Sequence, residues 1–166
     1  MTINKLLSAV AALALLAACE TASDTDGANG GNGFDANGNP IGSGSTAPGT
    51  QGDFEANVGD RVFFATDSSV VSGDAQATLG RQAAWLKQYP NAKVVLEGHA
   101  DERGTREYNL ALGERRANAA LNYLVSLGVD AGRVSVTSYG KERPAVLGHD
   151  ESAWSQNRRA VTVIAQ

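Results

Sequence analysis

An aspartate and an arginine, Asp101 and Arg116, are the residues whose types and spacing best suit recognition of a small charged ligand. A carboxylate accepts hydrogen bonds from an ammonium group, and a planar guanidinium binds a carboxylate through two parallel bonds. Held near each other, the two side chains could grip a zwitterion such as the free end of an amino acid. The alternative is a plain salt bridge between Asp101 and Arg116, or two solvated charges, because surface ion pairs are common and weakly stabilising.

The position of Arg116 depends on a helix predicted over 105–127, directly after a predicted loop over 98–104 that holds the aspartate. Thr105 suits the N-cap, and Gly128 suits the position after the last turn. Residues three, four and seven apart share one face of a helix. The stripe predicted in this way consists of Asn109, Leu112, Gly113 and Arg116. A glycine in mid-helix costs about 1 kcal/mol relative to alanine, which indicates that another group approaches this helix closely.

The remaining elements alternate between strands and helices and position this loop and helix against one sheet. Strands are predicted over 61–65, 93–97, 133–139 and 158–165, and a further helix begins at Ser72, Gly73 or Asp74 and ends at Tyr89. The segment before the last strand is predicted to be a loop. This order predicts an α+β domain over 60–166, a two-layer β-α-β-α-β sandwich with the helices on one face of the sheet.

Residues 1–18 have the pattern of a secretory signal peptide, in which Lys5 precedes an uncharged apolar run over 6–18. At ~1.5 Å per residue the run spans about 20 Å, short of the ~30 Å hydrocarbon core of a bilayer, so it does not suit a permanent membrane helix. The run ends in Leu-Ala-Ala-Cys, which is similar to the lipobox of bacterial lipoproteins. Cys19, the only cysteine in the chain, cannot form an intrachain disulfide, and we expect it to carry lipid.

Residues 19–59 are predicted to be a flexible, acidic tether rich in glycine and asparagine. Ten of the 42 residues over 19–60 are glycine, seven are acidic and none is Lys or Arg. Such a segment cannot bury enough apolar surface to offset its ordering entropy, and as a random coil it spans about 35 Å. Residues 61–166 hold eleven acidic and thirteen basic residues. This near-neutral balance argues against nucleic-acid binding, which needs a strong basic patch.

Two long motifs resemble those of the OmpA-like peptidoglycan-binding domain family of Gram-negative cell envelopes. The first, GHADERGTREYNLALGERRAN, begins at Gly98, and the second, SYGKERPAVLGHDESAWSQNRRAV, covers 138–161. The resemblance extends over about 105 residues, from Arg61 to the C-terminus. It implies the OmpA-like fold, and it is consistent with a lipid anchor and a tether before the domain.

The resemblance implies that the ligand is the diaminopimelate of the wall's stem peptide, whose amino-acid-like end is held by an aspartate and an arginine. In this sequence these are Asp101 of the GHxD motif and Arg116, which precedes Ala-Asn. The further residues implied to line or support the pocket are Phe64, Ala65, Thr66, Asn109 and Arg159. The chain departs from the family pattern at Ala100, where threonine is common, and over 65–67, where the family has an acidic F-D-x-D run.

The resemblance also implies partners and a location. Peptidoglycan would be the main ligand, with TolB and, as a second candidate, TolA of the Tol system as protein partners during outer-membrane constriction at division. In enteric sorting an aspartate after the lipidated cysteine retains a lipoprotein at the inner membrane, so Glu20 points to the outer membrane, with the domain facing the periplasm. A lipoprotein with the same wall-binding domain and no Tol partnership remains an alternative.

An enzyme would have to use His99, Asp101 and Glu102 as acid, base or metal ligands. A hydrolase needs a nucleophile or an activated water with an orienting base, and a catalytic zinc normally has three protein ligands. The chain has two histidines, His99 and His149. We therefore expect neither catalysis nor a metal site, and no cofactor beyond the covalent lipid on Cys19.

Overall fold

The computed structural model describes residues 33–34, 40–41 and 47–165. The predicted signal peptide and Cys19 lie outside these residues, as does most of the predicted tether. In the described part of that tether, the two-residue strands β1 (Gly33–Phe34) and β2 (Pro40–Ile41) pair in antiparallel fashion. None of the helices in the described ranges combines the length and the apolar character that a membrane crossing requires.

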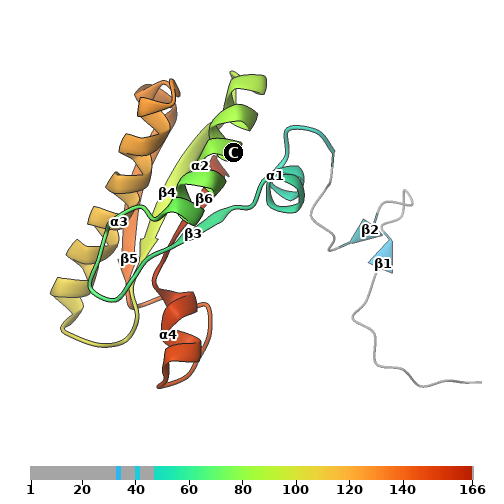
Figure 1. Ribbon diagram of the computed structural model, residues 1–166. Helices are drawn as coiled ribbons and strands as arrows, with labels where there is room; N and C mark the ends of the chain where they lie inside the picture. Colours follow the sequence, from blue (N-terminus) through green and yellow to red (C-terminus); the bar gives the residue numbers. More distant parts are fainter. Residues whose placement is uncertain (1–32, 35–39, 42–46, 166) are drawn as a thin grey trace, which may run out of the picture. The chain divides into compact units, whose positions relative to one another are not determined.

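Four strands form one mixed sheet in the order β3-β6-β4-β5 (Figure 1). Their bounds are β3 (Arg61–Phe63), β4 (Lys93–His99), β5 (Val134–Gly140) and β6 (Arg159–Ala165). Strand β6 is antiparallel to both of its neighbours, whereas β4 and β5 are parallel. A parallel pair needs a crossover connection, and the long helix between β4 and β5 provides it.

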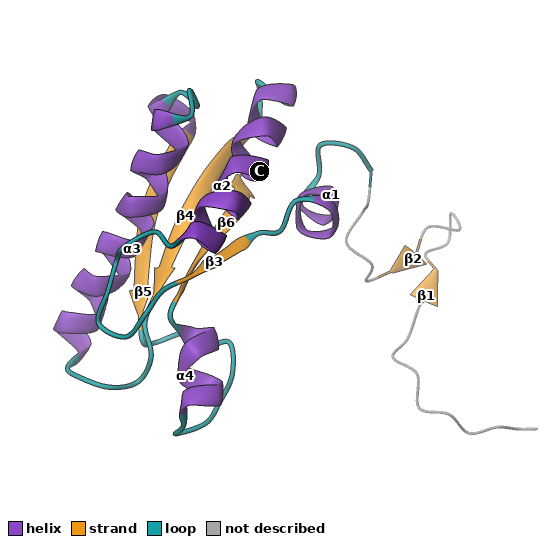
Figure 2. Cartoon of the chain, viewed as in Figure 1, coloured by secondary structure: helices purple, strands orange, loops and turns teal. Residues whose placement is uncertain are grey.

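Helices α2 (Gly73–Gln88) and α3 (Arg106–Ser126) cover the same face of the sheet, as Figure 2 shows. Each begins at a predicted cap, because the hydroxyl of Ser72 accepts from the amide of Ala75 and that of Thr105 accepts from the amide of Tyr108. The core lies between the two layers. Its fully buried aliphatic residues include Leu79, Leu86, Val94, Leu96, Ala117, Ala120, Leu124 and Ala160. The predicted two-layer α+β sandwich is confirmed.

The predicted end of the tether at residue 59 is wrong, because α1 (Gln51–Asn57) belongs to the folded domain. Phe54 is fully buried, and its ring packs edge-on against that of Trp85 with centroids 4.9 Å apart. The indole N–H of Trp85 donates to Asp53 at 2.8 Å. Composition averaged over a glycine-rich, acidic stretch gives no weight to one aromatic residue, although burying that residue is enough to dock a short helix.

The segment before β6 was predicted to be a loop and contains a helix, α4 (Glu151–Asn157). The carboxylate of Asp150 caps it by accepting from the amide of Ala153 at 3.2 Å. At its other end the Asn157 side chain accepts from the amides of Ala145 and Val146 at 2.7 and 3.0 Å. Seven residues are too few for the periodicity from which a helix is recognised.

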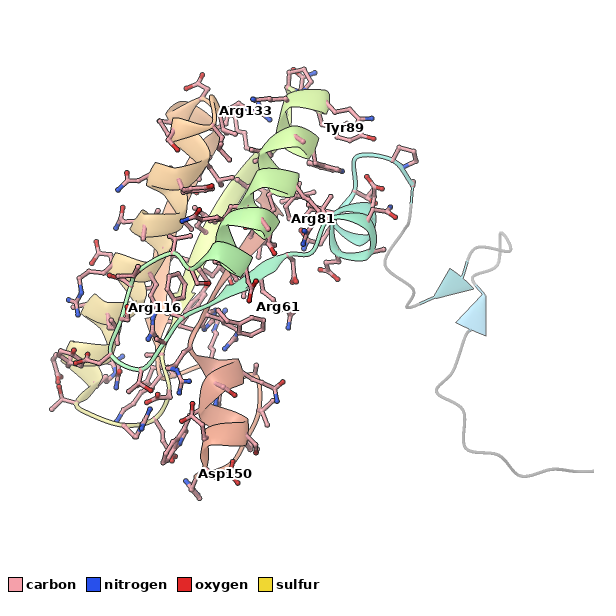
Figure 3. All side chains as sticks on the ribbon, in the orientation of Figure 1. Arg61, Arg81, Tyr89, Arg116, Arg133 and Asp150 are labelled. Carbon is pink, nitrogen blue, oxygen red and sulfur yellow. The ribbon has the colours of Figure 1, made fainter. Side chains whose placement is uncertain are left out.

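Two arginines hold the domain together, Arg116 in the middle of α3 and Arg133 beyond its C-terminus (Figure 3). Arg133 ends the short 3₁₀ helix η1 (Ala131–Arg133), and its guanidinium donates to the carbonyls of Leu86, Tyr89 and Ala92 at 2.7 to 2.9 Å. These bonds satisfy carbonyls at and after the C-terminus of α2, which have no partner within the helix. Arg116, in the middle of α3, belongs to the candidate site.

Gly113 marks a close approach between α3 and the sheet, as its position in mid-helix predicted. A Cβ on Gly113 would lie 2.4 Å from the Ser138 hydroxyl, and one on Gly98 in β4 would lie 1.8 Å from the carbonyl oxygen of Gly113. Neither distance is compatible with a side chain. The backbones of α3 and β4 are therefore in direct contact. This contact fixes the distance and orientation of Arg116 relative to the loop after β4.

Replacing Gly98 with alanine is expected to destabilise the domain by about 3 kcal/mol, because the methyl group would force the backbones of α3 and β4 apart. Gly80→Ala is the matched control, since a Cβ on this residue of α2 meets nothing within 4 Å. That substitution should leave stability unchanged or raise it by up to ~1 kcal/mol. Urea unfolding measures both effects, and equal midpoints for the two variants would contradict the close approach.

Candidate functional site

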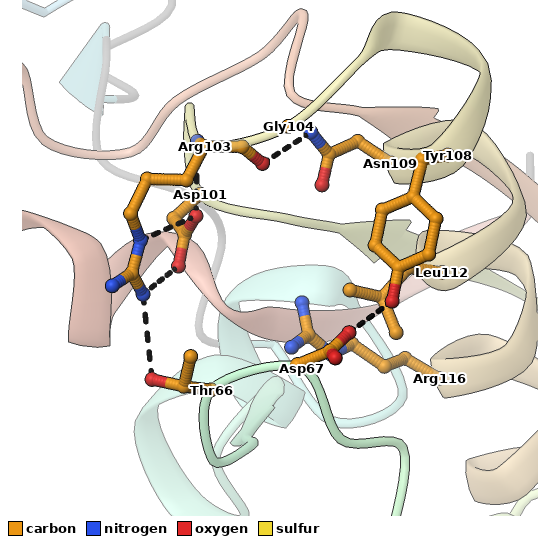
Figure 4. Close-up of a pocket in the computed structure, with 9 residues that line it drawn as sticks. All are labelled: Thr66, Asp67, Asp101, Arg103, Gly104, Tyr108, Asn109, Leu112 and Arg116. Atoms are coloured by element: carbon orange, nitrogen blue, oxygen red, sulfur yellow. Dashed lines mark hydrogen bonds and ion pairs between the residues drawn. The ribbon is translucent and has the colours of Figure 1, made fainter.

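A pocket of about 280 Å³ lies where the loop after β3, the loop after β4 and the first half of α3 meet. We call it the Arg116 pocket. It is lined by Thr66, Asp67, Asp101, Arg103, Gly104, Tyr108, Asn109, Leu112 and Arg116 (Figure 4). Four of these residues come from one face of α3, including three of the four predicted positions, 109, 112 and 116. The helical periodicity therefore placed the α3 wall of this pocket correctly.

Arg116 is fully buried, and backbone carbonyls hold its guanidinium from three directions. Its Nε donates to Ser68 at 2.8 Å, Nη1 donates to His99 at 2.8 Å and Nη2 donates to Ala65 at 3.1 Å. A guanidinium has five N–H groups, so one on each terminal nitrogen remains. The three bonds fix the orientation of the group, which points into the pocket in Figure 4.

The charge of Arg116 has no carboxylate within ion-pair distance among the described residues. Burial lowers the pKa of the guanidinium to about 10, against the opposing effect of the nearby Asp101 charge. The group therefore remains charged at neutral pH. A buried positive charge is costly unless an anion or strong acceptors compensate it. Three carbonyls compensate part of this cost at Arg116, and a ligand anion would compensate the rest.

Asp101 lies across the pocket and is 7% exposed. Its Oδ2 is 2.7 Å from Nη2 of Arg103 and 3.5 Å from Nη1 of Arg158, while its Oδ1 accepts from the backbone and Nε of Arg103 at 3.1 and 3.2 Å. Burial alone would raise the pKa of this carboxyl, but the hydrogen bonds from Arg103 and the charges of Arg103 and Arg158 lower it. Asp101 is therefore ionised at neutral pH.

Asp101 and Arg116 both line the Arg116 pocket, but they do not form the direct salt bridge that was one alternative from the sequence. Within the described residues, Asp101 pairs with Arg103 and Arg158, and Arg116 bonds to carbonyls. The pocket thus carries a buried cation and a buried anion that different groups hold in place. This arrangement suits a ligand that carries both charges.

Of the other residues predicted for the site, two line the Arg116 pocket and two lie beside it. Thr66 and Asn109 line the pocket, and Asn109 also ties the loop to the helix by donating to the carbonyls of Arg103 and Thr105 at 2.8 and 3.1 Å. Phe64 and Ala65 line a neighbouring hollow of about 410 Å³ instead. They act on the site through Arg116, which donates to the Ala65 carbonyl and lies 5.4 Å from the Phe64 ring centroid.

The predicted support from Arg159 is wrong, because Arg158 occupies that place. Arg158 is 5% exposed, contacts Asp101 and donates to the Phe64 carbonyl at 3.0 Å. Arg159, the first residue of β6, donates to the carbonyls of Asn157 and Arg143 at 3.4 and 3.2 Å and does not line the Arg116 pocket. Successive side chains in an extended chain point to opposite faces, so only one of two adjacent arginines can reach the site.

Four residues of the pocket were missed in the sequence: Asp67, Arg103, Gly104 and Tyr108. The hydroxyl of Tyr108 donates to the Asp67 carboxylate and so links α3 to the loop after β3. The i, i+4, i+8 spacing of Tyr108 with Leu112 and Arg116 could have placed it on this face. No periodicity applies to Asp67 and Arg103, which lie in loops.

The groups considered for catalysis do not converge. His99 is 2% exposed, and its ring lies 5.6 Å from that of Tyr139, outside the residues that line the Arg116 pocket. Glu102 bonds instead to His149 at 2.8 Å and to the Trp154 indole at 2.9 Å. Over the described ranges, no group of three or more His, Cys, Asp and Glu side chains is placed to hold a metal ion.

His99 should make the domain less stable in mild acid. Burial, together with the charges of Arg159 and Arg143, lowers its pKa to about 4, against an opposing effect of the Arg143 backbone. The unfolded chain takes up this proton below about pH 6.5, whereas the folded domain does so only below about pH 4. Stability is therefore full above pH 6.5 and falls by about 3 kcal/mol as the pH drops to 4.

Urea unfolding between pH 4.5 and 7.5 measures this loss. The slope of stability against pH should be shallower in His99→Gln than in the wild type. An unchanged slope in His99→Gln would contradict the assignment to His99.

Comparison with known proteins gives the class to which this fold and pocket belong. The model of the OmpA family matches residues 63–158, more than half of the chain. The chain therefore belongs to the OmpA family. A solved structure of the C-terminal domain of Helicobacter pylori MotB is similar in fold, with a TM-score of 0.60 at 20% identity over 64% of this chain and 84% of that one.

Relatives that share more than half of their aligned residues with this chain are peptidoglycan-associated lipoproteins. That of Rhizobium meliloti is 62% identical over 130 residues, which cover 78% of this chain and 74% of the relative. That of Brucella melitensis is 56% identical over 124 residues, with 75% and 74% covered. The crystal structure of the peptidoglycan-associated lipoprotein from Burkholderia pseudomallei has a TM-score of 0.62 at 46% identity and covers 64% of this chain and 90% of that one.

Proposed function

We propose that the chain is an outer-membrane lipoprotein that binds peptidoglycan noncovalently through the diaminopimelate of the stem peptide, held in the Arg116 pocket. The observation that carries the proposal is the fully buried guanidinium of Arg116, which is fixed by three carbonyls, keeps two N–H groups and faces an ionised Asp101. The free end of diaminopimelate is a zwitterion, with one carboxylate and one ammonium group on the same carbon.

The carboxylate of this end is assigned to Arg116. A guanidinium presents two parallel N–H groups to a carboxylate, and such bonds are strong where water is excluded. Because the three carbonyl bonds already orient Arg116, binding would immobilise little additional side chain. The ammonium group is assigned to Asp101, whose lowered pKa keeps it ionised.

The size of the pocket supports a small ligand end rather than a sugar or a whole peptide. About 280 Å³ lies at the lower limit of sites for small organic molecules. A terminal amino-acid group fits this volume, and the rest of the stem peptide and the glycan would remain outside. No cofactor is needed for such a grip, and the relatives reported above are named as lipoproteins rather than as enzymes.

The anchor and the location follow from the N-terminal pattern. A lipid on Cys19 would hold the chain at the outer membrane, and the linker before the domain would let it reach the wall from the periplasmic side. The lipobox-like sequence before Cys19 and the names of the relatives support this part of the proposal.

We further assign the chain to the Tol–Pal system, with TolB as partner, TolA as a second candidate and a role in envelope integrity and outer-membrane constriction at division. This assignment rests on the resemblance of the two sequence motifs to the OmpA-like family, which implies these partners. A wall-binding lipoprotein without a Tol partner is the alternative, and recovery of TolB with the chain after crosslinking in cells distinguishes the two.

Sedimentation with purified wall tests the wall-binding function. The full-length chain in mild detergent should pellet with diaminopimelate-containing sacculi and stay in solution with sacculi that carry lysine instead. The lysine side chain keeps the ammonium group and lacks the second carboxylate. Equal sedimentation with both walls, or with neither, would contradict the assignment of Arg116.

A further inference from the structure

Arg103 occupies the carboxylate that the proposed ligand needs. Its side chain reaches across the mouth of the Arg116 pocket, from Asp101, where Nη2 is 2.7 Å from Oδ2, to the Thr66 hydroxyl at 3.3 Å (Figure 4). With its backbone amide and Nε also on Oδ1, Arg103 contacts both oxygens of Asp101. Arg158 lies 3.5 Å from Oδ2 as well.

An incoming ammonium group therefore competes with a cation that is already bound. A carboxylate has about four lone-pair sites. Arg103 uses three of those on Asp101, and Arg158 lies 3.5 Å from one of the two oxygens, Oδ2. Three cations around one carboxylate repel one another, most strongly where water is scarce. Ligand binding at Asp101 is therefore favoured when one of the two arginines withdraws.

Of the two arginines, only Arg103 is free to move. The Arg158 side chain is 7% exposed and is also bonded to the Phe64 carbonyl, whereas that of Arg103 is 39% exposed. The backbone of Arg103 is held by the Asn109 side chain, which donates to its carbonyl at 2.8 Å. The loop can therefore keep its shape while the Arg103 side chain swings.

The Arg103 guanidinium also contacts an aromatic ring while it is bound to Asp101. Its central carbon lies 4.1 Å from the centroid of the Trp154 ring, a stacking distance for a cation on an aromatic face. The charges of Glu151 and Glu102 also act on Arg103. Glu151 pairs with Arg158 through Oε1, and its side chain is 63% exposed, so its other oxygen is open to a second cation. The guanidinium could leave Asp101, keep its contact with Trp154 and turn towards Glu151.

We propose that Arg103 is a gate, which binds Asp101 in the free domain and gives up this carboxylate to the ammonium group of the ligand. This inference rests on the proposed function. The gate keeps the buried Asp101 paired when no ligand is bound. It also lowers the affinity for every ligand, so that only one that supplies both an ammonium and a carboxylate replaces the lost contacts.

Removing the charge of Arg103 should tighten binding. In calorimetric titrations of the full-length chain with a diaminopimelate-containing muropeptide, Arg103→Gln is expected to bind on the order of tenfold more tightly than the wild type. The matched control is Arg106→Gln, which removes the same charge three residues further along the chain. The Arg106 side chain is 69% exposed and pairs with Glu142. This control should bind as the wild type does.

The outcomes of the titration distinguish failure of the gate from failure of the proposed function. Unchanged or weaker binding by Arg103→Gln, with normal binding by the wild type, would overturn the gate and leave the proposed function intact. Absence of binding by the wild type and both variants would overturn the proposed function, and the gate with it.

The wild type offers a second measurement that does not depend on how the variant folds. The side-chain Nε–H resonance of Arg103 and the indole resonances of Trp154 should shift as the muropeptide saturates the chain, because the guanidinium leaves Asp101 next to that ring. Saturation without any shift of the Arg103 resonance would overturn the gate.

Discussion

Arg116→Lys is expected to bind diaminopimelate-containing muropeptide on the order of 100-fold more weakly than the wild-type chain. Lysine keeps the positive charge, but its single ammonium group cannot bond to three carbonyls and also present two parallel donors to a carboxylate. The charge would also be free to move away from the position at which the ligand carboxylate is held. Calorimetric titration measures the loss directly.

Arg115→Lys provides the matched control for this prediction. Arg115 is the neighbouring residue on α3, is exposed and does not line the Arg116 pocket. The same chemical change there should leave the affinity within about twofold of the wild type. If Arg116→Lys also bound like the wild type while its thermal unfolding was unchanged, the carboxylate would have to be held elsewhere.

Asp101→Asn is expected to weaken the same interaction by roughly 30- to 100-fold, because the amide has nearly the same shape and lacks the charge that attracts the ammonium group. Both Arg103 and Arg158 lose their counter-ion in this variant. Thermal unfolding must therefore be measured alongside binding, so that loss of affinity is not confused with loss of the fold.

Glu102→Gln is the control for Asp101. Glu102 is the next residue, but its carboxylate points to His149 and Trp154 and does not line the pocket. Removing this charge should change the affinity by less than about threefold. Comparable losses in Asp101→Asn and Glu102→Gln would indicate a general effect of negative charge rather than a specific ammonium site.

The parts of the site that depend on helical periodicity could be predicted from the sequence. The spacing of Asn109, Leu112 and Arg116 fixes a common face of α3 whatever the helix packs against. Gly113 likewise indicated that another group approaches this helix closely, and the structure identifies that group as the backbone of Gly98 in β4.

The parts that depend on loop conformation and strand phase could not be predicted in this way. Nothing in the spacing of Asp101 and Arg103 shows that they pair with each other, because a loop has no fixed period. The choice between Arg158 and Arg159 depends on which face each residue takes at the start of β6. The early start of the domain depends on contacts of α1 with residues far away in sequence, such as those of Phe54 and Asp53 with Trp85.

The most direct test of the central claim is calorimetric titration of the full-length chain with two muropeptides that differ only in having diaminopimelate or lysine at the third position of the stem. The lysine form presents an ammonium group to Asp101 and no carboxylate to Arg116. We predict binding of the diaminopimelate form and a loss of at least about 100-fold for the lysine form. Equal affinity for the two muropeptides would show that Arg116 does not recognise a ligand carboxylate and would contradict the proposed function.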